Sequence, residues 1–346
     1  MSTAPTRHRP RRALHVAAAA IVTLGTLTAC GSPAGTTETS EPAATSDGDT
    51  TGYPVTIDNC GEDLVIESRP ESVMLLASTV LGTVEAAGGL DQIGSRTWEL
   101  TGDHWSEAIE DRVAEIPALT EAADGSGVTL EAIVEAQPDL VIGYESQALS
   151  RETLAAVGIP FYIIPAYCPE SPSTVSFDSV YEQVTTFGEI FGHPDAAATA
   201  NEELKTRVEA VSQVEGDIED GAMLFTSTSS GSLLTYGTAS MSNAQLDGLG
   251  IRNVFDDIPK RYLETSIETL VDRDPDVIVV LYPEGKDAED AINEVVSLPG
   301  ADALSAVANN RVIAQKLELT DPPNPYSVLG LEELSKQVSA FAASGN

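Results

Sequence analysis

The sequence predicts an α/β protein of two lobes, each built on a parallel sheet, joined by a single long helix. The first observation is a repeat: residues 129–143 read TLEAIVEAQPDLVIG and residues 266–280 read SIETLVDRDPDVIVV. The second is an alternation of buried-strand and helix patterns around each copy, which is typical of parallel sheets. The third is a stretch of helical periodicity over residues 173–214, between the two copies.

Each copy of the repeat predicts a helix, a Pro-Asp turn and a buried strand. Thr129 and Ser266 carry hydroxyls suited to capping the first turn of a helix. Apolar residues then recur at helical spacing until Pro138 and Pro275, where the helix must end. The aliphatic run after each proline suits a strand covered on both faces. Two copies therefore predict two similar lobes.

The first lobe is predicted over residues 53–172, beginning with a hairpin. Strands and helices alternate after the hairpin, as a parallel sheet requires. The expected elements are hairpin strands at 55–58 and 64–67, a strand at 72–77, a helix to Ala87, a strand at 92–97, the first repeat copy, a helix at 151–157 and a strand at 161–164.

The linking helix is predicted within residues 173–216, with an interruption near Gly192-His193-Pro194. The second lobe is predicted over residues 217–346 and repeats the alternation of the first. Its expected elements are strands at 222–226 and 233–236, a helix at 242–249, the second repeat copy, a further helix, a strand at 312–317 and a terminal helix from Leu331.

The first residues of the chain have the pattern of a lipoprotein leader. Four arginines precede an apolar stretch from Ala13 to Ala29, which is short for a membrane span. It ends in Leu-Thr-Ala-Cys, which resembles the lipobox of bacterial lipoproteins and predicts a signal peptide over residues 1–29. Cys30 would then be acylated, with palmitate-type chains, and anchor the protein to the outer face of the cell membrane. An ordinary signal peptide with an incidental cysteine is the alternative.

Residues 30–52 are rich in Ser, Thr, Gly, Pro and Ala and are expected to form a flexible tether. The whole chain holds 18 basic and 54 acidic residues, for a net charge of −36. Because no basic footprint exists, nucleic acid is excluded as a partner. The acidity suits an extracytoplasmic protein that stays soluble, and it weakly disfavours strongly anionic ligands. We expect a monomer.

Two cysteines remain if Cys30 is acylated. Cys60 and Cys168 are expected to form a disulfide, because an exported protein meets an oxidising compartment. Two buried free thiols are the alternative. Closing so long a loop would stabilise the fold by about 4–5 kcal/mol in the chain-entropy model, less any strain.

The order of lobe, long helix and lobe resembles the substrate-binding lipoproteins of ABC importers for ferric siderophores and cobalamin. The resemblance covers about residues 53–343 and is carried by the two repeat copies, by SVMLLASTVLGTVEAAGGLDQIG and by LPGADALSAVANNRVIAQ. It implies a ligand cleft between the lobes, a chelated-iron ligand, and an ABC permease with its ATPase as partners. It also implies that Glu131 and Glu268 dock onto permease arginines. Stabilisation of the helix N-terminus is the alternative role for both glutamates.

Candidate ligand-binding residues follow from the rule that ligands lie at the carboxyl ends of parallel strands, with aromatic walls and polar anchors. Each could instead be a structural rim residue. The candidates in the first lobe are Ser78, Thr79, Arg96, Trp98, Tyr144 and Tyr167, and those in the second lobe are Tyr236, Arg261, Tyr262, Tyr282 and Tyr326.

Catalysis has little support in the sequence. Beyond Cys30 there are two histidines, His104 and His193, and no metalloprotease, nucleophile-elbow or P-loop motif. We therefore expect no enzyme, no cofactor and no metal bound directly by the protein. An iron ion would arrive inside its chelator, and few arginines are available for an anionic one, which favours a hydroxamate. A cobalamin- or haem-type binding protein of the same fold is the alternative, followed by a lipoprotein enzyme or an adhesion module.

Overall fold

The computed structural model describes residues 52–119, 128–146, 149–170, 174–214, 216–226 and 232–344. All of these residues lie within the unit Asp47–Asn346. The predicted leader, Cys30 and nearly all of the predicted tether lie outside the described residues. Within the described ranges, no helix has the length and apolarity needed to cross a bilayer.

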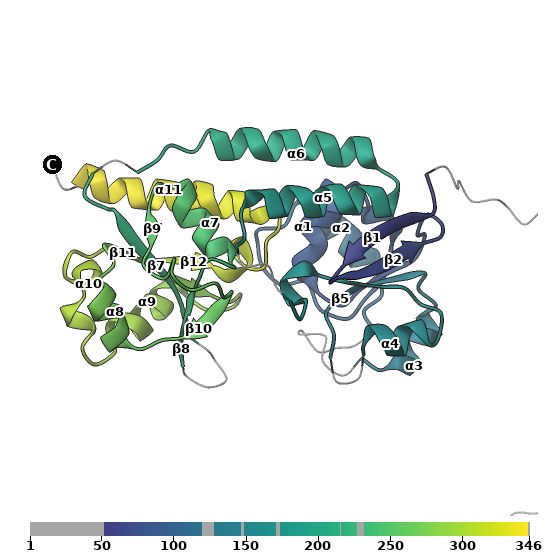
Figure 1. Cartoon of the computed structure of the whole chain (residues 1–346), viewed down its shortest axis with the longest axis horizontal. Coiled ribbons are helices and arrows are strands. Elements are labelled where there is room, and N and C mark those ends of the chain that lie inside the picture. Colours follow the sequence, from purple (N-terminus) through teal and green to yellow (C-terminus); the bar gives the residue numbers. More distant parts are fainter. Residues whose placement is uncertain are drawn as a thin grey trace, which may run out of the picture. The chain divides into compact units, whose positions relative to one another are not determined.

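The N-terminal lobe, on the right in Figure 1, is built on a four-stranded sheet. The strand order is β4-β3-β5-β6, and all four strands are parallel. The predicted hairpin precedes it as an antiparallel pair. The elements of this lobe are β1 (Val55–Asn59), β2 (Glu62–Ile66), β3 (Val73–Leu75), η1 (Ser78–Val80), α1 (Leu81–Ala86), η2 (Leu90–Gln92), β4 (Ile93–Arg96), α2 (Glu107–Glu115), α3 (Leu130–Ala136), β5 (Leu140–Gly143), α4 (Arg151–Ala155), β6 (Phe161–Ile163) and η3 (Pro165–Tyr167).

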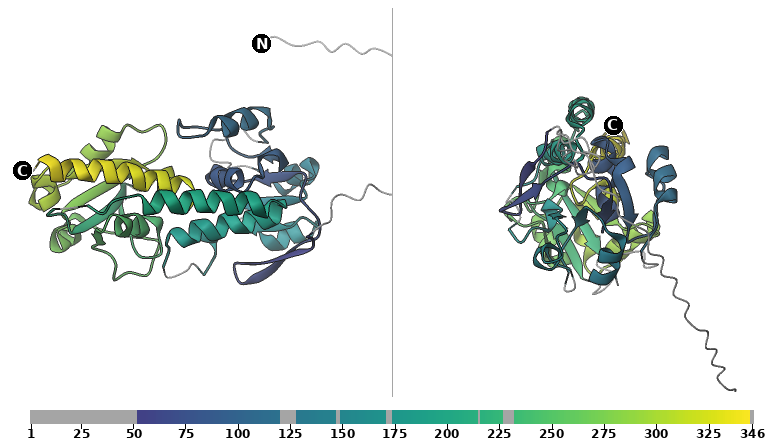
Figure 2. Two further views of the ribbon diagram at one scale, coloured as in Figure 1. Left: turned by 90° about the horizontal axis from the view of Figure 1, so that it is seen from above. Right: turned by 90° about the vertical axis from the view of Figure 1, so that its right-hand side faces the viewer.

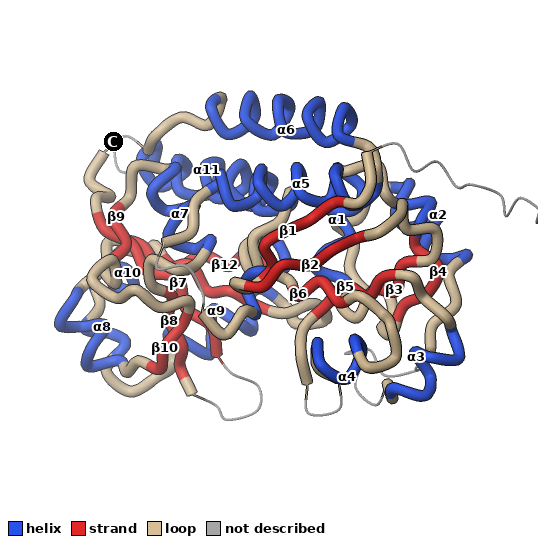
Figure 3. The backbone as a smooth tube through the Cα atoms, turned by 45° about the vertical axis from the view of Figure 1, so that its right-hand side comes forward, coloured by secondary structure: helices blue, strands red, loops and turns tan. Residues whose placement is uncertain are grey.

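The C-terminal lobe has a larger sheet in the order β10-β8-β7-β11-β12, with β9 also paired to β7. Figure 3 shows its strands as one group and those of the first lobe as another. The elements of this lobe are β7 (Asp220–Thr226), β8 (Leu233–Tyr236), α7 (Met241–Gly248), β9 (Arg252–Asn253), β10 (Tyr262–Glu264), α8 (Ile267–Arg273), β11 (Val277–Tyr282), α9 (Ala288–Val296), η4 (Ala301–Ala303), α10 (Ser305–Ala308), β12 (Val312–Lys316), η5 (Leu317–Leu319) and α11 (Tyr326–Ser344).

The second sheet is parallel at its centre, as predicted, and has an antiparallel edge that the sequence did not predict. β11 runs parallel to β7 and β12, but β8 is antiparallel to both β7 and β10. The physical reason is the connection length: β7 ends at Thr226 and β8 begins at Leu233, which leaves no room for the crossover that parallel neighbours need. The terminal helix also begins earlier than predicted, at Tyr326.

The sheets are covered on both faces. Along β3, Met74 packs into the cluster that contains Ile133 of α3, whereas Leu75 packs into the cluster that contains Val84 of α1. β11 behaves in the same way, with alternate residues packing toward α8 and α9 or toward α7 and α11. This double burial explains the unbroken aliphatic runs of the central strands.

The link consists of two helices instead of the single helix that was predicted, α5 (Phe177–Phe191) and α6 (Pro194–Glu209). They lie side by side in both Figure 1 and Figure 2. Gly192 ends α5 in a left-handed conformation, with φ of +75°, and Pro194 at the start of α6 cannot continue the same helix. The predicted interruption is therefore a reversal of the chain.

The chain passes between the lobes three times. After β6 it reaches the C-terminal lobe, where the N–H of Val175 donates to the carbonyl of Thr238 at 2.9 Å. α5 then returns to the N-terminal lobe, and its Phe187 and Phe191 join that lobe's core. α6 runs back, and its Val208 packs against the core of the C-terminal lobe.

The repeated pattern has the same structure in both lobes. Thr129 and Ser266 cap α3 and α8 through their hydroxyls, each at 3.2 Å from a backbone N–H, as predicted. The aspartate of each Pro-Asp pair has a shared second role. Asp139 accepts from two backbone N–H groups just before β3, and Asp276 does the same just before and at the start of β7, at 2.6–3.2 Å. Each carboxylate thereby aligns two neighbouring parallel strands.

Candidate functional site

The two lobes meet in a first contact region around Arg261, which precedes β10. Its Nη1 donates to the carbonyl oxygen of Ala166 in the opposite lobe at 2.9 Å, and its guanidinium lies 4.8 Å from the Tyr167 ring centroid. Asp321, which follows β12, pairs with the same guanidinium at 2.6 Å. Burial opposes the charge of Arg261, but Asp321 outweighs it, so the pKa of the guanidinium is raised.

Several predicted ligand contacts gather in this region. The rings of Tyr144 and Tyr167 pack against each other at an interplanar angle of 37°, with ring centroids 5.1 Å apart. Tyr236 and Tyr262 are opposite one another in the β8–β10 pair. Tyr262 is 55% exposed, whereas Tyr236 is 4% exposed, and burial raises the pKa of its hydroxyl. The structure therefore brings together four of the predicted tyrosines and one predicted arginine.

A second contact region joins the loop between β4 and α2 to the ends of β11 and β12. Lys316 contacts Asp103 of the opposite lobe and lies 3.5 Å from Glu284. The ring of His104 lies 4.1 Å from that of Trp105 and 5.3 Å from that of Tyr326.

Two further predicted ligand-binding residues, Tyr326 and Tyr282, can be located from the residues that surround them. The Tyr326 ring lies directly over α1, since a Cβ added at Gly82 would be 2.8 Å from it. Tyr282, at the end of β11, is partly buried beside Lys316, and burial raises its pKa.

Arg96 and Trp98 are not placed as predicted. The indole is 2% exposed and packs in the core of the N-terminal lobe. The Arg96 guanidinium lies 5.5 Å from that ring, and its Nε donates to the carbonyl of Ile116 at 3.3 Å. Both residues do lie at the carboxyl end of a strand, as the rule requires. However, β4 is an edge strand, and the chain after it turns inward and packs against α2. The structure argues against a direct ligand contact for either.

Ser78 and Thr79 lie in η1, directly after β3 and partly buried. The Thr79 hydroxyl oxygen is buried with no hydrogen-bond partner among the described residues. These two residues occupy the carboxyl end of a central strand, next to α1, which is the position predicted for polar anchors.

Glu131 and Glu268 occupy equivalent positions in the first turns of α3 and α8, and both are exposed. In Figure 1 both helices lie in the lower part of the view, on the side away from α5 and α6. The backbone N–H of Glu268 and the Ser266 hydroxyl lower the pKa of the Glu268 carboxyl. The pair thus marks one surface that both lobes share.

The predicted disulfide between Cys60 and Cys168 is present. It joins the turn of the β1–β2 hairpin to the segment after β6, next to Tyr167. Asn59 strengthens the same junction, because its side-chain amide bonds both the N–H and the carbonyl of Ile163 at 2.8 Å. The hairpin is thereby fixed to the edge of the first sheet.

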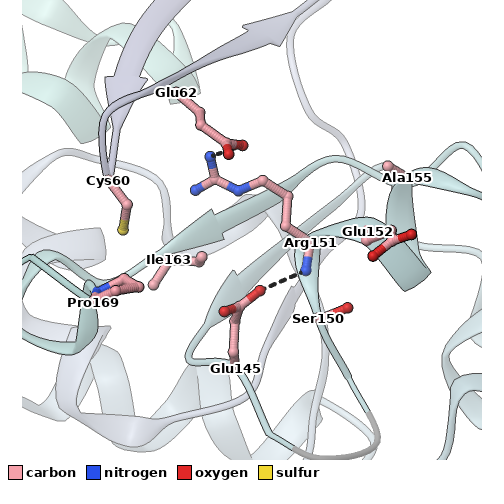
Figure 4. Close-up of a pocket in the computed structure, with 9 residues that line it drawn as sticks. All are labelled: Cys60, Glu62, Glu145, Ser150, Arg151, Glu152, Ala155, Ile163 and Pro169. Atoms are coloured by element: carbon pink, nitrogen blue, oxygen red, sulfur yellow. Dashed lines mark hydrogen bonds and ion pairs between the residues drawn. The ribbon is translucent and has the colours of Figure 1, made fainter.

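A surface cavity of about 480 Å³ lies beside this junction (Figure 4). Its lining includes Arg151, which pairs with Glu62 at 3.2 Å and donates through its backbone N–H to Glu145 at 2.8 Å. A second cavity, of about 510 Å³, lies between the link helices and α7. Neither of these two cavities is lined by residues of the two contact regions.

Asp103, Glu284, Lys316 and Asp321 belong to the contact regions but were missed in the sequence. The last three follow or end β11 and β12, so the carboxyl-end rule applied to every strand would have found them. Asp103 lies in a loop without a periodic pattern, and no sequence signal marks it.

Two α/β lobes that meet through the carboxyl ends of their strands define a two-lobed solute-binding protein. The family model described as periplasmic binding protein matches residues 73–318, and the chain belongs to that family. Proteins of this family work with ABC permeases.

Known relatives agree with this assignment. A structure from Saccharomonospora viridis, described as an ABC-type Fe3+-hydroxamate transport system, is 36% identical, with a TM-score of 0.73, and the match covers 82% of this chain and 99% of that one. The cobalamin-binding protein of Halobacterium salinarum is 27% identical over 96% of this chain and 85% of its own length. A periplasmic haem-binding protein of Vibrio cholerae shares the fold, with a TM-score of 0.60 at 16% identity over 77% of this chain and 97% of that one.

Proposed function

We propose that the protein is a lipid-anchored, extracytoplasmic receptor that captures a ferric siderophore, preferably a hydroxamate, and delivers it to an ABC permease and its ATPase. The similarity to the Fe3+-hydroxamate transport protein, at 36% identity, supports this ligand class. Acylation of Cys30 would hold the receptor at the membrane. In this proposal the protein has no catalytic role and needs no cofactor, and iron is carried inside the chelate.

The pairing of the contact-region cations is the observation that carries the choice of a hydroxamate. Arg261 is paired with Asp321, and Lys316 is paired with Asp103 and Glu284. A triply anionic tricatecholate would have to compete with these carboxylates for its positive partners, and desolvating it without such partners is costly. A neutral or cationic hydroxamate complex avoids that cost and suits the paired rings of Tyr144 and Tyr167.

Cobalamin is the second candidate, because the cobalamin-binding protein of Halobacterium salinarum matches 96% of this chain. A corrin ring would also use aromatic walls and does not require a cluster of free cations. Haem is a third candidate on the fold similarity to the Vibrio cholerae protein. Direct titration separates the three ligands.

The test is a fluorescence titration of the full chain carrying Cys30→Ser with ferrioxamine, a ferric tricatecholate, cyanocobalamin and haem. Trp105 lies in the second contact region, so a ligand bound between the lobes should quench its emission. We expect ferrioxamine to bind at least tenfold (~1.4 kcal/mol) more tightly than the tricatecholate. Tighter binding of the tricatecholate would contradict the charge argument, and tightest binding of cyanocobalamin or haem would replace the siderophore as the ligand.

A further inference from the structure

One imidazole and two carboxylates converge between the lobes, in the second contact region, and none of the three was predicted as a ligand from the sequence. Asp103 and His104 come from the loop after β4, and Glu284 comes from the end of β11 in the other lobe. One ligand atom from each of the three residues lies within 4.8 Å of the others. The sequence predicts no directly bound metal because it shows no clustered histidines, but spatial convergence across two lobes leaves no such signature.

The His104 imidazole is the unusual member of the group. Both of its ring nitrogens are buried and have no hydrogen-bond partner among the described residues, and the same holds for Glu284 Oε2. An unpaired buried polar atom destabilises a fold, so a side chain with two of them requires an explanation. The packing of the imidazole against Trp105 and Tyr326 fixes its position without satisfying either nitrogen.

The backbone is shaped to bring these atoms together. Gly102 has a φ of +101°, and an added Cβ would lie 3.0 Å from both Glu284 Oε2 and His104 Nδ1. A residue with a side chain would therefore hold the loop away from β11. Glycine lets the loop approach the opposite lobe at the position where the three donors meet.

Lys316 already places a cation beside the carboxylates. Its ammonium contacts Asp103 and lies 3.5 Å from Glu284. The ammonium forms ion pairs with both carboxylates, but it leaves Glu284 Oε2 and both imidazole nitrogens without a hydrogen bond. The lysine stem is flexible, so its head group can leave the carboxylates.

We propose that Asp103, His104 and Glu284 form a binding site for a divalent transition-metal ion of the zinc class, in competition with the Lys316 ammonium. Three protein ligands of the imidazole and carboxylate type suit zinc, with a water as the fourth ligand. Zinc bonds of about 2.0–2.2 Å place the ligand atoms of a tetrahedral site about 3.3–3.6 Å from one another. The three ligand atoms here lie within 4.8 Å of one another, so they must move closer together when the ion binds. Asp103, whose side chain is 87% exposed, is free to make that movement.

The ion would link the two lobes directly, since its ligands come from both. Binding should therefore stabilise the folded protein in proportion to the free metal concentration. This site does not rest on the proposed siderophore function, because its ligands are protein side chains and no chelate is involved.

Zinc titration of the full chain carrying Cys30→Ser tests the proposal, with calorimetry and the visible spectrum of bound Co2+ as readouts. The serine removes a thiol that could bind zinc. We expect one ion per chain in the wild-type site. Lys316→Met should bind at least tenfold more tightly, because the competing ammonium is gone, whereas His104→Gln and Glu284→Gln should each bind at least tenfold more weakly.

His193→Gln is the matched control, because His193 is the other histidine beyond Cys30 and lies at the start of α6, bonded to Arg69 at 2.7 Å. The zinc affinity of His193→Gln should equal that of the parent protein. Asp103→Asn changes an exposed side chain and serves as a second probe if His104→Gln fails to fold. The proposal is overturned if neither the parent nor Lys316→Met binds saturably with a Kd below about 0.1 mM, or if His193→Gln loses as much affinity as His104→Gln.

Discussion

Arg261 connects three parts of the molecule through one guanidinium. It pairs with Asp321 in its own lobe, donates to the Ala166 carbonyl of the other lobe, and lies over the Tyr167 ring. The side chains of Arg261 and Asp321 are 16% and 7% exposed, so each charge depends on the other for compensation. The residue predicted as a ligand anchor is therefore also a structural link between the lobes.

Replacing Arg261 by Met should destabilise the protein by about 3 kcal/mol, because Asp321 is left as a buried charge without its partner. The measurement is urea unfolding at neutral pH. The double variant Arg261→Met with Asp321→Leu should regain most of that loss, because it removes both charges together.

A matched control is the more exposed pair of Arg207 and Glu332, whose side chains are 43% and 26% exposed. Arg207→Met should cost no more than about 1 kcal/mol, since water screens the remaining charge. Equal losses for Arg207→Met and Arg261→Met would show that burial of the Asp321 pair has no energetic weight.

The limits of sequence-based prediction at this scale are visible in Trp98. The carboxyl-end rule selected Tyr167, which contacts Arg261 of the other lobe, and Tyr144, which packs against Tyr167. It also selected Trp98 and Arg96, which turn into the core. The rule states where a strand ends, not which way the next residues turn. That direction depends on α2, a helix that the sequence analysis did not identify.

At the scale of elements, most of the α/β alternation could be read from the sequence, because buried strands and amphipathic helices leave distinct periodicities. The caps of both repeat copies were also predictable. The role of Asp139 and Asp276 was not predictable, because the backbone N–H groups that they accept from lie at the start of neighbouring strands, more than 50 residues earlier in the chain. The sequence showed an interruption between α5 and α6, but it did not show that the chain reverses direction there.

Gly188 determines how closely the two link helices pack. A Cβ added there would lie 2.4 Å from the Cβ of Ala197 on α6. We expect Gly188→Ala to destabilise the protein by about 1–3 kcal/mol in thermal or urea unfolding, because overpacking outweighs the better helix propensity of alanine.

The second change Ala197→Gly should relieve the contact and recover part of the lost stability. Gly285→Ala is a comparison site at which an added Cβ meets nothing within 4 Å, although its φ of +82° adds local strain. No loss of stability in Gly188→Ala would mean that the helices separate without cost.

At the scale of the whole molecule, Glu131 and Glu268 lie in the first turns of α3 and α8. Figure 1 shows these two helices on the same side of the two lobes. If they dock onto the permease, Glu131→Ala combined with Glu268→Ala should reduce uptake of the bound ligand at least tenfold in cells. Ligand affinity of the purified protein should change by less than twofold, because neither residue belongs to a contact region.

Glu152→Ala combined with Glu289→Ala is a control of the same kind, with one acidic first-turn residue removed from each lobe at α4 and α9. It should leave uptake unchanged. A loss of ligand affinity in the Glu131 and Glu268 variant would withdraw the docking role, since it would place these residues in support of the ligand site.

The three passes of the chain between the lobes have a mechanical consequence. A single connecting strand would act as a swivel, whereas two packed helices such as α5 and α6 resist torsion and share any tensile load. α5 and α6 are also packed against each other and against the lobes at their ends. The molecule should therefore resist most strongly a twist of one lobe against the other. It should yield most easily to a small bend that opens the face opposite these helices. A permease that pulls on both lobes from that face would work along the soft direction.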